Sequence, residues 1–176
     1  MNTAVFGGGC FWCTEAIFQM LKGVSKVEPG YAGGEMENPS YERVSEGNTG
    51  HAEVIRVTYD PKIITYEDLL TVFFGSHDPT TPNRQGNDVG EQYRSIILYQ
   101  TPEEKVAADK LVKDVQESLK DGSHVVTQVL PLRKFFGAEE YHKDYYKTNS
   151  SAPYCQIIIE PKIEKVKKRF AELVQQ

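Results

Sequence analysis

Two cysteines near the amino end of the chain, Cys10 and Cys13, are the residues best suited to chemistry. They frame Phe11 and Trp12, the only tryptophan of the sequence, and follow directly after Gly7-Gly8-Gly9. The glycines allow a sharp turn and a close approach of the backbone to a ligand. A cysteine attacks an electrophile as its thiolate, so the stretch predicts thiol chemistry if its surroundings favour that form.

The elements around Cys10 predict such surroundings. The apolar run at residues 3–6 is typical of a strand, and apolar residues at helical spacing from Ile17 to Leu21 predict a helix that stops near Gly23. Cys10 then stands where the strand gives way to the first helical turn. Free N–H groups and the positive end of the helix dipole favour a thiolate there. An inert buried cysteine at a core turn is the plainer interpretation, and the clustering of both cysteines with the tryptophan weighs against it.

The composition excludes several classes of protein. A net charge of −5 gives no basic footprint for nucleic acid. No apolar run approaches the roughly 20 residues that span a bilayer, and the first residues lack the pattern of a secretory signal. We therefore expect a cytoplasmic protein without nucleic acid or membrane partners, and we take it to be a monomer. Three cysteines are an odd number and too few for a disulfide scaffold, which favours redox or metal chemistry over structural bridges.

The remaining elements follow from apolar periodicity and turn residues. Strands are predicted at residues 24–30, 51–59, 94–100, 125–130 and 154–160, and helices at residues 66–74, 101–120, 138–147 and 161–176. Two long polar segments rich in glycine or proline, one reaching to about Gly50 and the other at residues 77–93, are predicted as irregular. Their length indicates binding loops rather than passive connections.

The order of the elements is strand, helix, strand, strand, helix, strand, followed by a helix, a strand and a C-terminal tail. It predicts an α+β fold with a ferredoxin-like (split βαβ) two-layer core, extra helices and a long irregular C-terminal segment. The sequence has no repeat, low-complexity tract or linker, which predicts a single catalytic domain over residues 1–176.

Three classes of protein use Cys-x-x-Cys at a helix start. A thioredoxin-like dithiol carrier has a βαβ unit before the motif, whereas one short strand precedes Cys10. A structural zinc site needs four ligands, and nothing pairs with Cys155 at ligand spacing. The histidines are scattered, and three of them are assigned structural or surface positions: His77, His124 and His142. The third class is a cysteine that attacks an electrophile and is resolved by another, and we favour it over a zinc-binding or dithiol module.

Several blocks of glycine, aromatic and polar residues stand in a fixed order between Gly7 and Ser95. They are Gly9-Cys10-Phe11-Trp12 with Glu15, Gly30-Tyr31-Ala32-Gly33-Gly34, Asn38-Pro39-Ser40-Tyr41, Gly50-His51-Ala52-Glu53, His77-Asp78-Pro79 and the run 84–95. In this combination the sequence resembles the methionine sulfoxide reductase A family. Tyr154-Cys155 is similar to the C-terminal recycling segment of that family, whereas Cys13 stands where many members have glycine.

The resemblance implies a reductase of the S epimer of methionine sulfoxide, free or in oxidised proteins and peptides. Cys10 is implied as the nucleophile at the sulfoxide sulfur, and Glu53 as the acid that protonates its oxygen, which requires a raised pKa. The implied substrate-binding residues are Phe11, Trp12, Tyr41, Asp88 and Tyr93. The hydroxyl groups of Tyr41 and Tyr93 are implied to hold the oxygen. Phe11 and Trp12 would form an apolar wall for the S-methyl group. Asp88 would belong to the polar network beside the nucleophile.

The same resemblance implies a sulfenic acid on Cys10 that condenses with a neighbouring thiol to give a disulfide. Cys13 lies one helical turn away, and Cys155 needs a mobile segment such as the polar residues 149–153. Resolution by Cys13 followed by Cys155, and direct resolution by Cys155, both stay open. The implied reductant is thioredoxin or another dithiol, with no metal or other cofactor.

Overall fold

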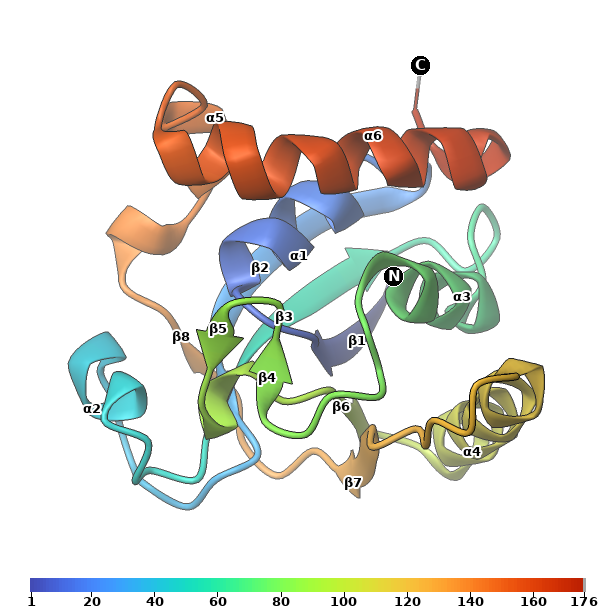
Figure 1. Ribbon diagram of the computed structural model, residues 1–176, viewed down its shortest axis with the longest axis horizontal. Helices are drawn as coiled ribbons and strands as arrows, with labels where there is room; N and C mark the ends of the chain where they lie inside the picture. Colours follow the sequence, from blue (N-terminus) through green and yellow to red (C-terminus); the bar gives the residue numbers. More distant parts are fainter. Residues whose placement is uncertain (176) are drawn as a thin grey trace.

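The computed structural model describes residues 1–175. Six strands form one sheet in the order β7-β6-β1-β3-β2-β8 (Figure 1). In that order they are Gln128–Pro131, Ile96–Tyr99, Asn2–Gly7, Ala52–Tyr59, Val24–Ala32 and Phe136–Gly137. Neighbours run antiparallel, except that β6 and β7 are parallel. The predicted α+β class is confirmed.

Helices cover one face of this sheet and its ends (Figure 1). They are α1 (Phe11–Gln19), α2 (Tyr41–Ser45), α3 (Tyr66–Ser76), α4 (Pro102–Ser118), α5 (Tyr145–Thr148) and α6 (Glu160–Arg169). A small hairpin of β4 (Arg84–Gln85) and β5 (Asp88–Val89) lies in the second predicted irregular segment. Within residues 1–175, none of the helices combines the length and apolar character that crossing a membrane requires.

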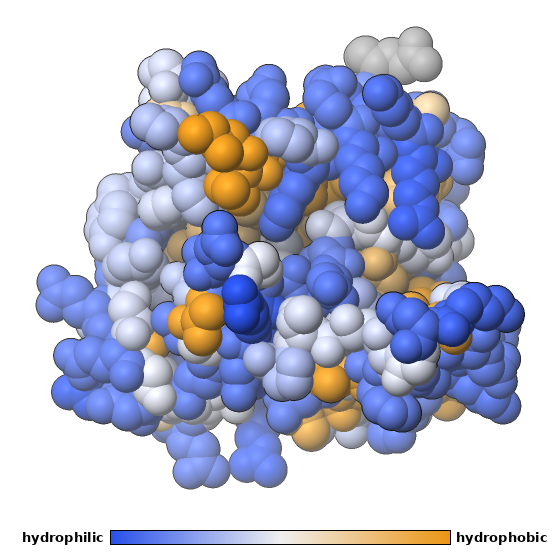
Figure 2. Space-filling model, in the orientation of Figure 1, coloured by the Kyte–Doolittle hydropathy of each residue, from blue (hydrophilic) through white to orange (hydrophobic). Residues whose placement is uncertain are grey.

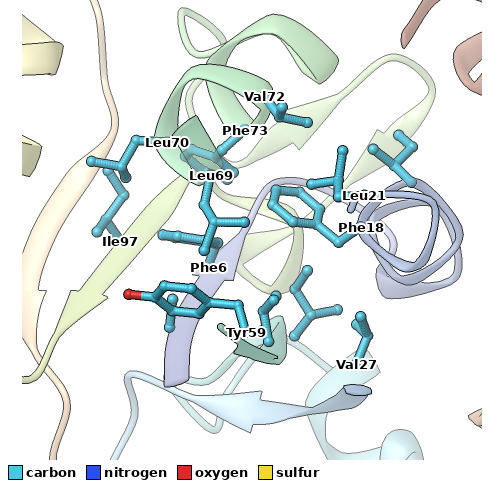
Figure 3. Close-up of a cluster of buried hydrophobic side chains, with 14 of the residues drawn as sticks. Phe6, Phe18, Leu21, Val27, Tyr59, Leu69, Leu70, Val72, Phe73 and Ile97 are labelled. Atoms are coloured by element: carbon cyan, nitrogen blue, oxygen red, sulfur yellow. The ribbon is translucent and has the colours of Figure 1, made fainter. Parts of the chain in front are cut away.

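The main core lies between the sheet and the helices α1 and α3 (Figure 3). Phe6 of β1 stands at its centre, with ring centroids 5.8 Å from Phe18 of α1 and 5.2 Å from Phe73 of α3. Successive strand residues point to opposite faces, so Val5 packs in a second, smaller cluster with Leu132 and Phe135 of the chain behind the sheet. Strand β1 is therefore covered on both faces and carries the chain directly to Cys10.

Local capping signals define where α3 and α4 begin. Thr65 caps α3 in a reciprocal capping box with Asp68, and Thr101 caps α4 with Pro102 in the first turn.

The surface is mostly hydrophilic on the face shown in Figure 2, including the region over α6, with hydrophobic side chains in small separate patches. Such scattered exposure is normal for a folded chain.

Predictions for the carboxyl-terminal third are largely wrong. Residues 154–160 were expected to be extended but form a π-helical turn, Cys155–Ile159, that runs directly into α6. Pro161 cannot donate to the carbonyl of Ile157, and its ring would crowd that carbonyl in a regular helix. A wider π turn accommodates the proline. The C-terminal segment is therefore less irregular than expected.

Two other elements of this region differ from expectation. The helix predicted at residues 138–147 is split into a 3₁₀ turn, Glu140–His142, and α5, because Asp144 between them has a left-handed φ of +54°. The helix predicted to the end of the chain stops at Arg169, and Gln176 lies outside the described residues. The strand predicted at residues 125–130 is shifted to β7, where it pairs with β6.

Candidate active site

Cys10 lies at the junction of β1 and α1, as predicted. Its backbone is extended, and its carbonyl accepts the N–H of Cys13 at 3.1 Å, which starts the helix. Gly9 before it has a left-handed φ of +99°, and a Cβ there would lie 2.9 Å from the Gln85 side chain. Glycine is therefore required at this turn. The turn presents the thiol at the amino end of α1.

The surroundings of Cys10 do not favour the thiolate that the sequence predicts. Burial, a hydrogen bond with the Cys13 thiol and the charge of Glu53 raise the pKa of Cys10 well above its ordinary value. The N–H of Trp12 acts in the opposite direction and is the weaker influence. The hydrogen bond from Cys10 lowers the pKa of Cys13 to about 7. Without substrate, Cys10 therefore holds its proton and Cys13 is the more readily ionised thiol.

Glu53 of β3 points toward the same place. Its side chain is buried, and its Oε1 accepts the backbone N–H of Phe11, the residue after Cys10, at 3.1 Å. Burial raises the pKa of Glu53 to about 8 against the effect of this hydrogen bond. At neutral pH the carboxyl group is therefore protonated, which is the form that a general acid requires.

Tyr41 and Tyr93 come from short helical elements within the two segments that were predicted as irregular. Tyr41 opens α2 and Tyr93 ends the 3₁₀ turn Glu91–Tyr93, and both are half-buried. Burial and then the charge of Glu53 raise the pKa of both phenols, that of Tyr41 to about 12. The charge of Cys10 raises the pKa of both phenols as well. Their hydroxyl groups stay protonated and able to donate.

Phe11 and Trp12 take different positions. Phe11 is fully buried, with its ring 5.7 Å from Tyr31 and 5.0 Å from His142. Trp12 is half-buried, stacks on Tyr145 at 3.7 Å with the rings nearly parallel, and donates from Nε1 to His142 Nδ1 at 3.0 Å. The indole therefore stands as a fixed apolar surface beside Cys10, whereas Phe11 supports the site from the core.

Asp88 of β5 reaches the cysteines through Tyr154. The Tyr154 hydroxyl donates to Asp88 Oδ2 at 3.1 Å and lies 3.8 Å from the Cys13 sulfur. Tyr154 also stands edge-on to Trp12, with ring centroids 5.7 Å apart. A polar network thus joins the hairpin to the amino end of α1.

The sequence did not reveal three of these contacts. His142 was assigned a structural or surface position, and Tyr145 and Tyr154 received no role of their own, yet all three hold Trp12. His142 and Trp12 are 130 residues apart, so no local spacing joins them. Only the position of Tyr154 beside Cys155 offered a signal.

Cys155 is fully buried and packs in one cluster with Cys13, Ala16, Ile159 and Ile163. Cys10 contacts the edge of this cluster, and all three cysteines are free thiols. Burial and the charge of Cys13 raise the pKa of Cys155. Cys155 thus belongs to a helical turn packed on α1. Cys13 shares the cluster of Cys155 and is also hydrogen-bonded with Cys10. Among residues 1–175, no group of three or more His, Cys, Asp and Glu side chains is arranged to hold a metal.

Comparison with known proteins agrees with this geometry. The peptide methionine sulfoxide reductase family matches residues 2–174 of the chain. The chain belongs to this family. Its curated relatives include the peptide methionine sulfoxide reductase MsrA of Sulfolobus acidocaldarius, 53% identical with 98% of this chain and 97% of that protein covered. MsrA of Saccharolobus solfataricus is 49% identical, with 99% and 97% covered.

Solved structures of family members are also similar. Reduced Mxr1 from Saccharomyces cerevisiae matches with a TM-score of 0.81 at 36% identity, covering 88% of each chain. Methionine sulfoxide reductase A of Corynebacterium diphtheriae matches at 0.83 and 34% identity, covering 86% of this chain and 76% of that one. Mxr1 in complex with Trx2 matches at 0.58 and 26% identity, covering 82% and 84%. Family membership favours the sulfoxide reductase over the zinc or dithiol module.

Proposed function

We propose that this protein reduces methionine-S-sulfoxide, free or within peptides and proteins, to methionine, with thioredoxin or another dithiol protein as reductant. The observation that carries the proposal is the buried Glu53 carboxyl, which accepts the N–H of the residue that follows Cys10 and whose pKa burial raises. The names of the relatives and of the yeast complex with Trx2 support the same reaction.

In the proposed reductase step, the Cys10 sulfur attacks the sulfoxide sulfur and gives up its thiol proton, while Glu53 gives its own proton to the sulfoxide oxygen. The hydroxyl group passes to the Cys10 sulfur, methionine leaves, and the thiol proton restores the neutral Glu53 carboxyl. Cys10 is thereby oxidised to a sulfenic acid, and the substrate sulfur is reduced by the same two electrons. The donated proton removes the negative charge that would otherwise develop on oxygen in a buried site.

Tyr41 and Tyr93 are proposed to donate hydrogen bonds to that oxygen. Both phenols keep their protons through the neutral pH range, because burial raises their pKa values. Donors held in place before the reaction stabilise the charge at little reorganisation cost. Trp12 is proposed as the apolar wall for the S-methyl group, with Phe11 behind it and Asp88 fixing the network at its edge.

Recycling is proposed to run from Cys10 through Cys13 to Cys155. The Cys13 thiol attacks the sulfenic sulfur, water leaves, and a Cys10–Cys13 disulfide forms. Cys155 then attacks the Cys13 sulfur, which frees Cys10 and leaves a Cys13–Cys155 disulfide for the dithiol protein. The packing of Cys13 against Cys155, with Cys10 at the cluster edge, supports this order over direct resolution by Cys155.

A dithiol protein cannot reach Cys155 while that side chain is fully buried. We therefore infer that oxidation loosens the π-helical turn Cys155–Ile159, so that the new disulfide becomes accessible.

The finer description of the protein also remains a proposal. The central strand order β6-β1-β3-β2, with α1 and α3 as the connecting helices, supports a split βαβ core of the ferredoxin-like type. We further propose a single catalytic domain that acts as a monomer in the cytoplasm, where dithiol reductants are present, and that needs no cofactor besides the dithiol.

The test is turnover of each methionine sulfoxide epimer with a thioredoxin system. We expect reduction of the S epimer only, in the parent protein and not in Cys10→Ser. Activity retained in Cys10→Ser, or equal turnover of both epimers, would contradict the proposal.

A further inference from the structure

Glu15 is a buried carboxyl on α1 that the proposed reaction does not use. Only 2% of the residue is exposed, and its Oε2 accepts the backbone N–H of Asp144 at 3.0 Å. One turn further along α1, Gln19 donates from Nε2 to Asp144 Oδ1 at 2.8 Å. Two side chains on one face of α1 therefore hold a single residue that is 129 positions away from Glu15.

Asp144 needs such support because of its backbone. Its φ of +54° and ψ of 32° lie in the left-handed region, which residues other than glycine rarely adopt. It is also the residue from which α5 begins, and its own side chain makes no capping hydrogen bond. The Glu15 carboxyl supplies the acceptor for an N–H group at this helix start, which an N-cap side chain supplies elsewhere.

The anchored turn leads directly to the substrate side of the site. Tyr145 follows Asp144 and stacks on Trp12 with ring centroids 3.7 Å apart and planes 7° apart. Trp12, Glu15 and Gln19 lie along one face of α1, so the helix that carries Cys10 also holds the turn that packs on its tryptophan. A shift of Asp144 would carry the Tyr145 ring off the indole.

We propose that Glu15 is a positioning residue for sulfoxide binding: by holding the Asp144 turn it keeps Tyr145 stacked on Trp12, and thereby sets the apolar wall that receives the S-methyl group. The proposal rests on the proposed function, because it assigns the consequence of that stacking to substrate binding. Glu15 itself touches neither the reacting sulfur nor the substrate.

The surroundings of Glu15 indicate what its removal would do. A cavity of about 320 Å³ lies against Glu15 and Gln19 and is lined by Lys26, Lys143 and Lys147. Truncation to alanine would enlarge this polar cavity, and water rather than protein would meet the N–H of Asp144. Burial raises the pKa of Glu15 to about 7, but a neutral carboxyl or a glutamine amide still offers an oxygen to that N–H.

The test compares Glu15→Ala with Glu15→Gln and with Glu104→Ala as a matched control. Glu104 also accepts a backbone N–H through its carboxyl, from Gln100 at 2.9 Å, but on α4 away from the site. Because Trp12 is the only tryptophan, intrinsic fluorescence reports the stacking directly. The second readout is KM and kcat for methionine-S-sulfoxide, measured on folded protein.

For Glu15→Ala we expect a red-shifted Trp12 emission and a KM raised about tenfold, with a smaller change in kcat, as for the loss of one buried hydrogen bond. Glu15→Gln should restore the parent emission and bring KM to within about threefold of the parent value. Glu104→Ala should lower the melting temperature and leave emission and KM unchanged. Parent-like emission and KM in a folded Glu15→Ala protein would overturn the proposal and leave Glu15 a purely structural residue.

Should Glu15→Ala not fold, Gln19→Ala tests the same anchor from a more exposed side chain. A red shift and a raised KM of smaller size support the proposal there, and parent-like values overturn it. Failure of the proposed function has a different signature. The parent protein would then fail to reduce methionine-S-sulfoxide, while the emission of the Glu15 variants would still respond as expected.

Discussion

The backbone N–H of Phe11 and the Glu53 carboxyl are joined by a hydrogen bond of 3.1 Å. Phe11 follows Cys10 in the chain, so this bond fixes the carboxyl beside the sulfur, while burial raises its pKa to about 8. A turn between β1 and α1 and a strand from the middle of the chain thereby place the proposed nucleophile and the proposed acid together. The proposed reaction depends on this pairing.

Glu53→Gln should slow the reductase step by about 10²–10³-fold, because glutamine accepts the same N–H but has no proton to give. The step is measured as methionine formed in a single turnover, by rapid quenching. Alkylation of Cys10, measured above pH 8 where Glu53 of the parent is ionised, should stay at least as fast, because the variant lacks the negative charge that raises the Cys10 pKa. Parent-like methionine formation in this variant would remove Glu53 from the mechanism.

The same variant should be more stable than the parent in alkaline solution. The pKa of Glu53 is raised from 4.5 to about 8 on folding, so the unfolded chain releases this proton at lower pH than the folded protein does. Stability of the parent therefore falls as pH rises through that window and levels off above it. Denaturant unfolding should show Glu53→Gln ahead by about 5 kcal/mol near pH 9 and without this advantage near pH 4. The opposite trend would mean that Glu53 is already ionised in the fold.

Removal of one site hydroxyl, in Tyr41→Phe or Tyr93→Phe, should lower the single-turnover rate about tenfold each. Burial and the charge of Glu53 raise the pKa of both phenols, so they keep their protons at neutral pH. The double variant should lose more than either single one, since two donors serve one oxygen. A double variant as fast as the parent would show that neither hydroxyl meets the developing charge.

The three cysteines should be oxidised in the order Cys10, Cys13, Cys155. All three are free thiols before reaction, and one should remain after a single turnover of the parent. Cys155→Ser should stop at a Cys10–Cys13 disulfide, and Cys13→Ser should make methionine once and then lose thioredoxin-dependent turnover. Peptide mapping by mass spectrometry identifies the linked residues. A Cys10–Cys155 disulfide formed at the parent rate in Cys13→Ser would favour direct resolution.

The amino-terminal half of the fold could be predicted because its signals are local. The run before Gly7, the apolar spacing after Cys13 and the capping residue Thr65 each define an element within a few residues. The amino end of α1 follows from the same signals, and with it the position of Cys10. The resemblance to a family then supplied Glu53, Tyr41 and Tyr93, which no spacing could have connected to that turn.

The carboxyl-terminal third could not be predicted, because contacts distant in sequence determine it. The apolar run Ile157-Ile158-Ile159 resembles a strand locally, yet Cys155 and Ile159, four residues apart, are the positions buried against α1. Asp144 interrupts a predicted helix because Glu15 and Gln19 hold it in a left-handed conformation. The thiolate expected on Cys10 from the helix dipole was also wrong, since burial and Glu53 outweigh the amino end of the helix.

The central claim is that the Cys10 sulfur takes the oxygen of the sulfoxide. It is tested most directly with methionine-S-sulfoxide carrying a heavy oxygen isotope and the double variant Cys13→Ser/Cys155→Ser, which cannot form the disulfides. Mass spectrometry after one turnover should find one labelled oxygen on Cys10 for each methionine produced. Methionine formed while Cys10 stays unmodified, or labelled oxygen on another residue, would contradict the account.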